Sequence, residues 1–163
     1  MLRHRPFSTS DLQTICSFPR GETELFYFYP KAVYPLTPEQ LQDAIDRRSD
    51  STVIEKEGAV VGFANFIRWN NGICHIGNVV VAPSSRGEGV ARYLIKTMIT
   101  LARERHSASA VRVSCFANNT AGLLLYKKLE FTPYDIEERR GHDGRRIALV
   151  HMHYPITKAH QQP

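Results

Sequence analysis

The chain has 163 residues, of which 42% are hydrophobic and 23% are charged, with a formal net charge of +5. This length and composition are ordinary for one globular domain with a sizeable core. No apolar run approaches the ~20 residues of a membrane-spanning helix, and no secretory signal is visible. The three cysteines, Cys16, Cys74 and Cys115, are far apart, which argues against a disulfide framework or a Cys-x-x-Cys metal site. We therefore expect a cytoplasmic protein that binds no metal and no membrane.

The positive charge is spread along the chain and forms no basic block. A moderate positive excess suits a ligand that carries several phosphate charges. A nucleic-acid-binding domain stays open as an alternative, which would require the arginines to gather on one face of the fold. The residues concerned are Arg47, Arg48, Arg139, Arg140, Arg145 and Arg146.

The first third of the chain predicts a strand over 2–7 and a short helix over 8–17. The aromatic-rich segment from Phe18 to Leu36 has no sustained period, and we predict a structured loop or a broken helix there. A helix start follows at Thr37-Pro38-Glu39-Gln40, with Thr37 as N-cap and Gln40 as its capping-box partner. That helix is predicted to run to about residue 48.

The middle of the chain predicts an antiparallel meander, with strands over 52–55, 59–69 and 73–81. An amphipathic helix over 89–106 follows, and then a strand over 111–116 and a helix over 120–129. Two closing strands are predicted over 131–138 and 146–154. The elements together predict one α/β domain over 1–157, with 158–163 as a disordered tail.

The most informative segment reads Val79-Val80-Val81-Ala82-Pro83-Ser84-Ser85-Arg86-Gly87-Glu88-Gly89-Val90-Ala91. A strand stops at a proline, and a glycine turn leads into a helix, whose first unpaired N–H groups can bind phosphate. A nucleotide P-loop would carry Lys-Ser or Lys-Thr after its last glycine, and a dinucleotide loop would carry a third glycine at Arg92. Neither fits, and an ordinary strand-to-helix connection is the alternative.

A second motif reads Asn119-Thr120-Ala121-Gly122-Leu123-Leu124-Leu125-Tyr126-Lys127-Lys128-Leu129-Glu130-Phe131. Asn119, Tyr126 and Phe131 match the pattern Asn-x-x-Ala-x-x-x-Tyr-x-x-x-Gly-Phe, from which Gly122 and Glu130 depart. In this order the two motifs resemble those of the GNAT superfamily of N-acetyltransferases. Because Glu130 replaces the usual glycine, the helix must end without its favoured left-handed residue.

The resemblance implies an α/β fold with a mixed, largely antiparallel central sheet flanked by helices, splayed where the strands 73–81 and 111–116 run parallel. It implies acetyl-CoA as co-substrate, with its pantetheine arm along the backbone of Val79, Val80 and Val81. The backbone of Arg86, Gly87, Glu88, Gly89, Val90 and Ala91 would hold the pyrophosphate. Asn119 would bind an amide of the cofactor, or would only cap the following helix.

Two residues are implied as catalytic. Tyr126 would protonate the leaving thiolate, since a tyrosine of pKa ~10 stays protonated where a thiol of pKa ~8.5 ionises; a plain core tyrosine is the alternative. His75 lies eleven residues before Arg86, where family members carry a glutamate, or a histidine in the arylalkylamine branch. His75 is the candidate base, and a histidine that only hydrogen-bonds at a strand edge is the alternative.

Three other residues bear on this chemistry. Ser114 stands in the place of the other common family base, a glutamate on the next strand, which removes that competitor. His151 and His153 lie two apart on a strand, hence on one face, but no third ligand is spaced to complete a metal site with them.

The resemblance thus implies an acetyl-CoA-dependent N-acetyltransferase, in which a primary amine of a small molecule or peptide attacks directly in a ternary complex. We expect the acceptor between the aromatic segment 18–36 and the closing strand pair, where Glu22 and Glu24 attract a cationic amine or are merely solvated. A CoA-binding regulatory module without turnover is the alternative from another class, and a missing base would favour it. A homodimer is left open.

Overall fold

The structure, a computed structural model, describes residues 1–156, and its elements follow the predicted order with small shifts at their ends. The tail expected at 158–163 lies outside the described residues. The elements are β1 (Leu2–Pro6), η1 (Thr9–Asp11), α1 (Leu12–Cys16), α2 (Glu22–Phe28), α3 (Pro38–Asp46), β2 (Ser49–Lys56), β3 (Ala59–Arg68), β4 (Ile73–Val81), η2 (Pro83–Ser85), α4 (Val90–His106), β5 (Ala110–Phe116), α5 (Thr120–Lys128), β6 (Thr132–Arg140) and β7 (Arg146–Pro155). None of the helices in residues 1–156 combines the length and apolarity that a membrane crossing requires.

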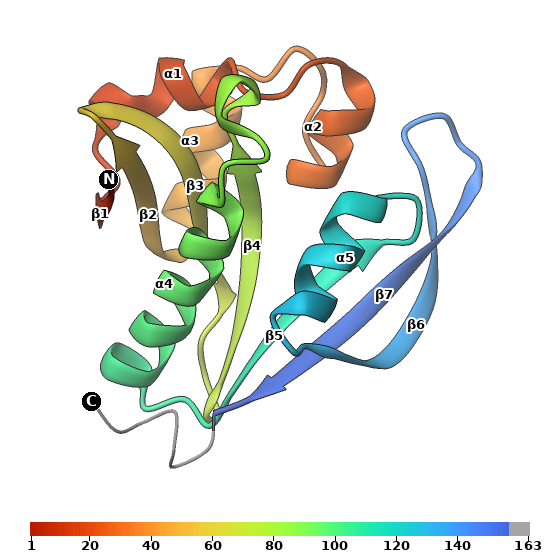
Figure 1. The fold of residues 1–163 in the computed structure, drawn as a ribbon. Helices are drawn as coiled ribbons and strands as arrows, with labels where there is room; N and C mark the ends of the chain where they lie inside the picture. Colours follow the sequence, from red (N-terminus) through yellow and green to blue (C-terminus); the bar gives the residue numbers. More distant parts are fainter. Residues whose placement is uncertain (157–163) are drawn as a thin grey trace.

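The strands of the described chain form one seven-stranded sheet in the order β1-β2-β3-β4-β5-β7-β6 (Figure 1). Neighbouring strands are antiparallel except for β4 and β5, which are parallel. A parallel pair needs a crossover connection, and α4 supplies it. The predicted mixed, largely antiparallel sheet is therefore confirmed.

The parallel pair is splayed, as expected. β4 and β5 are paired only over Ile73–His75 and Ala110–Arg112, and beyond these residues the two strands diverge (Figure 1). In the same part of β4, Asn78 has a φ of +50° and the register against β3 shifts, which marks a β-bulge. The bulge bends β4 away from its parallel neighbour.

Buried side-chain hydrogen bonds hold this bulge. Asn78 Nδ2 donates to the Phe28 carbonyl at the end of α2 (3.0 Å), and Asn65 Nδ2 donates to Asn78 Oδ1 (3.0 Å). Asparagine also tolerates the left-handed φ better than most other residues. The divergence of β4 and β5 therefore has a local cause, the asparagine pair under α2.

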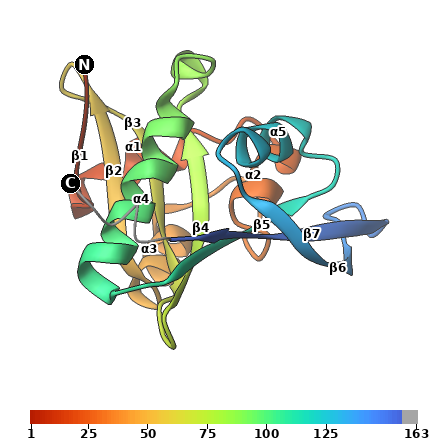
Figure 2. The same ribbon diagram turned by 60° about the horizontal axis from the view of Figure 1, so that its bottom comes forward.

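Helices cover both faces of the sheet. α4 packs on β3 and β4, and Figure 2 shows α5 on the same side of the sheet, whereas α1, α2 and α3 pack on β2, β3 and β4 from the opposite side. Large side chains buried between these layers include Phe63, Phe66, Leu94, Ile95 and Met98. Full burial of each contributes about 1.5–3 kcal/mol to stability.

The aromatic segment, predicted as a structured loop or a broken helix, contains one short helix with irregular chain on both sides of it. It contains α2, and its buried aromatic side chains, Phe18, Phe26, Phe28 and Tyr29, belong to the core. At the start of α3, Thr37 caps as predicted, because its hydroxyl accepts from the Gln40 N–H (3.4 Å). The predicted return bond from the Gln40 side chain is wrong: that amide instead bonds the backbone of Val33 and Pro35.

Helix α5 ends without the left-handed glycine that usually terminates such a helix, as the sequence indicates. Glu130 itself adopts the left-handed conformation, with a φ of +70°, and its side chain is exposed. The following N–H, of Phe131, donates to the Tyr126 carbonyl (2.9 Å), so the helix closes around this strained residue.

Candidate active site

The loop between β4 and α4 presents a row of unpaired backbone N–H groups. The Tyr93 N–H donates to the Gly89 carbonyl, but the amides from Gly87 to Arg92 have no hydrogen-bond partner in the described part of the chain. Gly87 and Gly89 have φ values of +79° and +84°, and nothing lies within 4 Å of a Cβ built on either. An anion could therefore approach this backbone closely at the positive end of α4.

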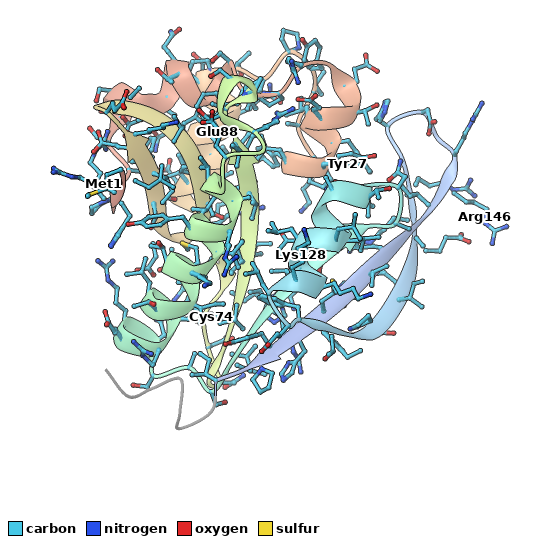
Figure 3. The ribbon with its side chains drawn as sticks, in the orientation of Figure 1. Met1, Tyr27, Cys74, Glu88, Lys128 and Arg146 are labelled. Carbon is cyan, nitrogen blue, oxygen red and sulfur yellow. The ribbon has the colours of Figure 1, made fainter. Side chains whose placement is uncertain are left out.

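The charged side chains of this loop are held by neighbouring elements. Arg86 Nη2 lies 2.9 Å from Glu24 Oε1 of α2, and Arg86 Nε donates to the Val81 carbonyl (3.3 Å). The hydrogen bond from Arg86 is the largest cause that lowers the pKa of Glu24. Glu88 pairs with Lys56 (2.9 Å), and Figure 3 shows Glu88 in the loop that precedes α4. The predicted phosphate contacts thus concern the backbone of this loop.

The exposed edge of β4 begins where the strands diverge. The Ala82 N–H donates to the Val61 carbonyl of β3, and the backbone groups of consecutive strand residues point alternately to either side. Val80, which is paired with Phe63, therefore directs its backbone groups to β3. Val79 and Val81 direct their backbone groups to the side of β5. The contact with a pantetheine arm stays a prediction for all three valines, and this geometry favours Val79 and Val81 over Val80.

Tyr126 is buried in α5, with its ring 5.6 Å from that of Phe131. Its hydroxyl has no hydrogen-bond partner among the described residues. Among those residues the unpaired side-chain oxygen or nitrogen that is fully buried is Ser51 Oγ, and the Tyr126 hydroxyl is not fully buried. The Tyr126 hydroxyl therefore keeps contact with accessible space. Burial raises the pKa of Tyr126 well above its usual value, and the nearby Cys115 adds to the rise. The hydroxyl thus stays protonated at neutral pH and can donate.

Asn119 caps α5, because its Oδ1 accepts from the Gly122 N–H (3.1 Å). The capping alternative is therefore realised, and the cofactor contact stays a prediction. A Cβ at Gly122 would lie 2.8 Å from Asn119 Nδ2 and 2.9 Å from Cys115 Sγ. Cys115 fills the space that the usual alanine would need, which explains the glycine in this motif.

His75 is half-buried and is the last residue of β4 that is paired with β5. Its neighbours across the sheet are Arg68 on β3 and Arg112 on β5. Burial lowers the pKa of His75 most, and Arg68, Arg112 and His151 lower it further. The imidazole is therefore neutral at pH 7 and able to accept a proton, but no hydrogen bond from the described residues fixes its orientation.

A cavity of about 530 Å³ lies between α2, the loop after β5 and the β6–β7 hairpin. Its lining includes Phe26 and Tyr27 of α2 and His142, Asp143 and Arg145 of the hairpin. Figure 3 shows Tyr27 on the side of α2 that faces α5. The lining combines aromatic rings with charges of both signs.

His142, which lines this cavity, joins the hairpin to α2. His142 Nδ1 lies 3.3 Å from Glu22 Oε2, and His142 Nε2 lies 3.1 Å from Thr23 Oγ1, so the hairpin is joined to α2. Glu24 is thus paired with Arg86, whereas Glu22 lies beside His142 with its side chain 68% exposed.

A family model described as the acetyltransferase (GNAT) family matches residues 13–131, a range that contains both the glycine loop and Tyr126. The chain belongs to the GNAT acetyltransferase family. Acetyl-CoA is the co-substrate of this family. The loop before α4 has unpaired backbone donors of the kind that bind phosphate. No curated protein sequence matches the chain significantly.

Solved structures share the GNAT fold over nearly the whole chain. Spermidine N-acetyltransferase from Vibrio cholerae, in complex with CoA and spermine, is 16% identical, with a TM-score of 0.79 over 94% of this chain and 95% of that one. YncA from Salmonella typhimurium, with its cofactor acetyl-CoA, is 20% identical, with a TM-score of 0.74 over 97% and 95%. Ribosomal-protein-alanine N-acetyltransferase from Brucella melitensis is 23% identical, with a TM-score of 0.74 over 94% and 99%.

This GNAT domain also carries a polar cluster that the sequence motifs do not reveal. The cluster lies on the sheet face to which His75 of β4 belongs. Ser114 of β5 contacts His151 of β7, and His151 contacts Glu137 of β6. Arg112 of β5 contacts His153 of β7. The sequence signal for this cluster was the spacing of His151 and His153, which places both on one face of a strand. Their hydrogen-bond partners could not be predicted, because these depend on the register of neighbouring strands. In the described range no three His, Cys, Asp or Glu side chains come together as metal ligands.

The arginines of the nucleic-acid alternative do not gather in this GNAT fold. Arg47 and Arg48 follow α3, whereas the other four belong to the β6–β7 hairpin, and Figures 1 and 2 show these elements on opposite sides of the molecule. Arg48 donates to Asn65 Oδ1 (3.4 Å), and Arg146 pairs with Glu138 (2.6 Å). The single basic face that this alternative requires is absent from residues 1–156.

Proposed function

We propose that this GNAT protein transfers the acetyl group of acetyl-CoA to a primary amine by direct attack in a ternary complex. One observation carries the proposal: β5 separates two sets of reactive groups where it leaves β4. Cys115, beside Tyr126, lies on one face of β5, and Ser114 lies on the other, with the acceptor cavity at the end of the strand. A thioester between β4 and β5 would then have a proton donor on its thiolate side and an open amine side.

The cofactor would be held mainly by backbone groups. The amides from Arg86 to Ala91 would bind the pyrophosphate, and Val79 and Val81 would pair with the pantetheine amides as an added strand does. Asn119 keeps its Nδ2 for the cofactor, since its Oδ1 caps α5. Backbone recognition explains why Ser84, Ser85, Glu88 and Val90 can vary from the family pattern.

Tyr126 is the proposed general acid, and His75 is a proposed base. The Tyr126 hydroxyl is protonated and unpaired, so it can donate to the thiolate as the C–S bond breaks. His75 is neutral at pH 7 and lies on the amine side of the sheet, so it can accept a proton from the nitrogen.

The acceptor would enter the cavity between α2 and the β6–β7 hairpin. The apolar part of the amine would lie on Phe26 and Tyr27, and its polar part would face His142, Asp143 and Arg145. A small amine and the amino group of a peptide both fit this description. The unpaired cysteines and the use of acetyl-CoA support a cytoplasmic location.

An acceptor screen tests the proposal. Polyamines, amino acids, arylalkylamines and peptides are incubated with acetyl-CoA, and the released CoA thiol and the acetylated product are both measured. We expect thiol release above the hydrolysis rate for at least one class of amine. Tight acetyl-CoA binding with no acetylated product from any amine would replace the enzyme with a CoA-binding regulatory module.

A further inference from the structure

Three side chains on the amine side of the sheet form a continuous hydrogen-bond chain. Ser114 Oγ of β5 lies 2.7 Å from His151 Nδ1 of β7, and His151 Nε2 lies 2.7 Å from Glu137 Oε1 of β6. The strand register pairs Ser114 directly with His151. A hydroxyl, an imidazole and a carboxylate joined in this order are an arrangement that moves protons through the hydroxyl.

Ser114 places this chain beside the proposed reaction site. Its side chain is exposed, although the strand on both sides of it is buried. It follows Arg112, the last residue of β5 that is paired with β4, and so it is the first residue on this face beside the divergence. Two residues further on, Phe116 packs against Phe26 in the cavity wall, with ring centroids 4.4 Å apart. Ser114 therefore lies along β5 between the end of its pairing with β4 and the residue that packs on the cavity wall.

The hydrogen-bond chain has a defined proton direction. Hydrogen bonds from Arg139 and His151 lower the pKa of Glu137, so its carboxylate is ionised and only accepts. His151 therefore carries its hydrogen on Nε2, and its Nδ1 accepts from the Ser114 hydroxyl. His153, two residues along the same strand, has no such chain, because its Nδ1 accepts from Arg112 Nε (3.1 Å).

We propose that Ser114, His151 and Glu137 form a proton relay that removes the proton which the acceptor ammonium group must lose before it attacks acetyl-CoA. The ammonium proton moves to Ser114 Oγ as the serine hydroxyl proton moves to His151 Nδ1. His151, whose side chain is 19% exposed, then releases its extra proton to solvent. This relay rests on the proposed acetyltransferase function.

The remaining steps balance the reaction. The neutral amine attacks the thioester carbonyl, a C–N bond forms and the C–S bond breaks. The nitrogen loses its second proton as the amide forms. The thiolate takes one proton from Tyr126, and the tyrosinate then regains a proton from solvent. The net reaction releases one proton for each acetyl group transferred.

His75 and the relay serve different protons. Arg68 and Arg112 flank His75 and oppose a positive charge on its ring, whereas His151 contacts a carboxylate. The amine nitrogen loses two protons in all, so His75 is available for the second. The groups that face His151 from neighbouring strands are His75, Ser114, Tyr134, Asp135 and Glu137.

The test compares variants across pH with an alkyl amine acceptor. kcat and KM are measured from pH 6.5 to 10 for the wild type, Ser114→Ala, His151→Gln and the matched control His153→Gln, with folding checked by circular dichroism. We expect kcat of His151→Gln to fall about 100-fold at pH 7, and that of Ser114→Ala to fall less, because a water can replace the hydroxyl. Both variants should approach the wild-type rate near the amine pKa of ~10, where about half of the amine is already neutral. His153→Gln should stay near the wild-type rate throughout.

Glu137 is a positioning residue in this relay. Glu137→Gln keeps an acceptor for His151 Nε2 but loses the charge, so kcat should fall at pH 7 with KM unchanged, and the loss should also disappear at high pH.

Two results would overturn the relay, and they can be told apart. If the wild type turns over an amine and folded Ser114→Ala and His151→Gln keep its rate at pH 7, or lose rate equally at every pH, the relay is wrong and the acetyltransferase stands. If the wild type acetylates no amine, the acetyltransferase proposal fails and the relay fails with it.

Discussion

Arg86 Nη2 lies 2.9 Å from Glu24 Oε1 and so joins the candidate pyrophosphate loop to α2, which forms one wall of the candidate acceptor cavity. The guanidinium of Arg86 in this loop is thus already paired with a carboxylate. A bound pyrophosphate would compete with Glu24 for this cation, because phosphate oxygens and carboxylates accept from arginine in the same bidentate way. Cofactor binding at this loop would therefore be coupled to the position of α2 through this ion pair.

The first prediction concerns this ion pair. Glu24→Gln removes the competing carboxylate, so acetyl-CoA should bind about two- to fivefold more tightly, the range expected for a partly exposed pair. Isothermal titration calorimetry measures the change, and raising the salt concentration should reduce it. Unchanged or weaker binding at low salt would show that Glu24 does not compete with the cofactor.

The second prediction concerns the glycine loop. Gly89→Asp places a negative charge beside the unpaired amides and should weaken acetyl-CoA binding about tenfold or more, which is about 1.4 kcal/mol. Gly89→Asn is the matched control. Asparagine has the same shape as aspartate and tolerates the left-handed φ of +84° about as well, but it carries no charge. Equal affinities for the two folded variants would remove the pyrophosphate from this loop.

The third prediction concerns Tyr126. Tyr126→Phe removes only the hydroxyl and keeps the packing on Phe131, so kcat should fall about 100-fold while acetyl-CoA affinity stays the same. Since burial raises the pKa of Tyr126, the wild type should show no loss of rate from tyrosine ionisation up to pH 10. A wild-type rate for the variant with a chemistry-limited acceptor would reduce Tyr126 to a packing residue.

The fourth prediction concerns the acid side of the pH–rate profile. A base must be neutral to accept a proton, and the pKa of His75 is lowered from 6.5 by burial and by Arg68 and Arg112. The rate controlled by His75 should therefore persist as pH falls and decline only below 6.5. His75→Gln should lower kcat and remove this decline from the profile. An identical acid limb in the wild type and in His75→Gln would place the base elsewhere.

The features that sequence alone predicts here are those set within a few neighbouring residues. A proline, two glycines and an apolar stripe define the end of β4, the loop and α4, and the spacing from Asn119 to Phe131 locates Tyr126. The ion pair of Arg86 with Glu24 and the contact of Ser114 with His151 depend instead on strand register and helix placement between distant segments. No local pattern encodes such contacts, because many registers would satisfy the same alternation of polar and apolar residues.

The β-bulge is an intermediate case. Asn78 is a polar residue in an apolar strand, which signals an irregularity, but its partners Asn65 and the Phe28 carbonyl come from β3 and α2. Tertiary contacts thus decide where β4 leaves β5. The same holds for Val80, whose backbone direction follows from the pairing with Phe63.

The fifth prediction concerns the strained end of α5. Glu130 is exposed and has a φ of +70°, a conformation that costs a non-glycine residue about 1–2 kcal/mol. Glu130→Gly removes this cost but adds about 0.4–1 kcal/mol of unfolded-state entropy, so the free energy of unfolding should rise by about 0.5–1 kcal/mol. For a chain of this size, the melting temperature should rise by about 2–4 °C per kcal/mol.

Glu130→Ala is the control for this prediction. It also removes the negative charge from the helix C-terminus but keeps the strained φ, so the difference in stability between the two variants isolates the effect of the backbone. Thermal and urea unfolding measure both, and a glycine variant no more stable than the alanine variant would show that the structure relieves this strain by other means.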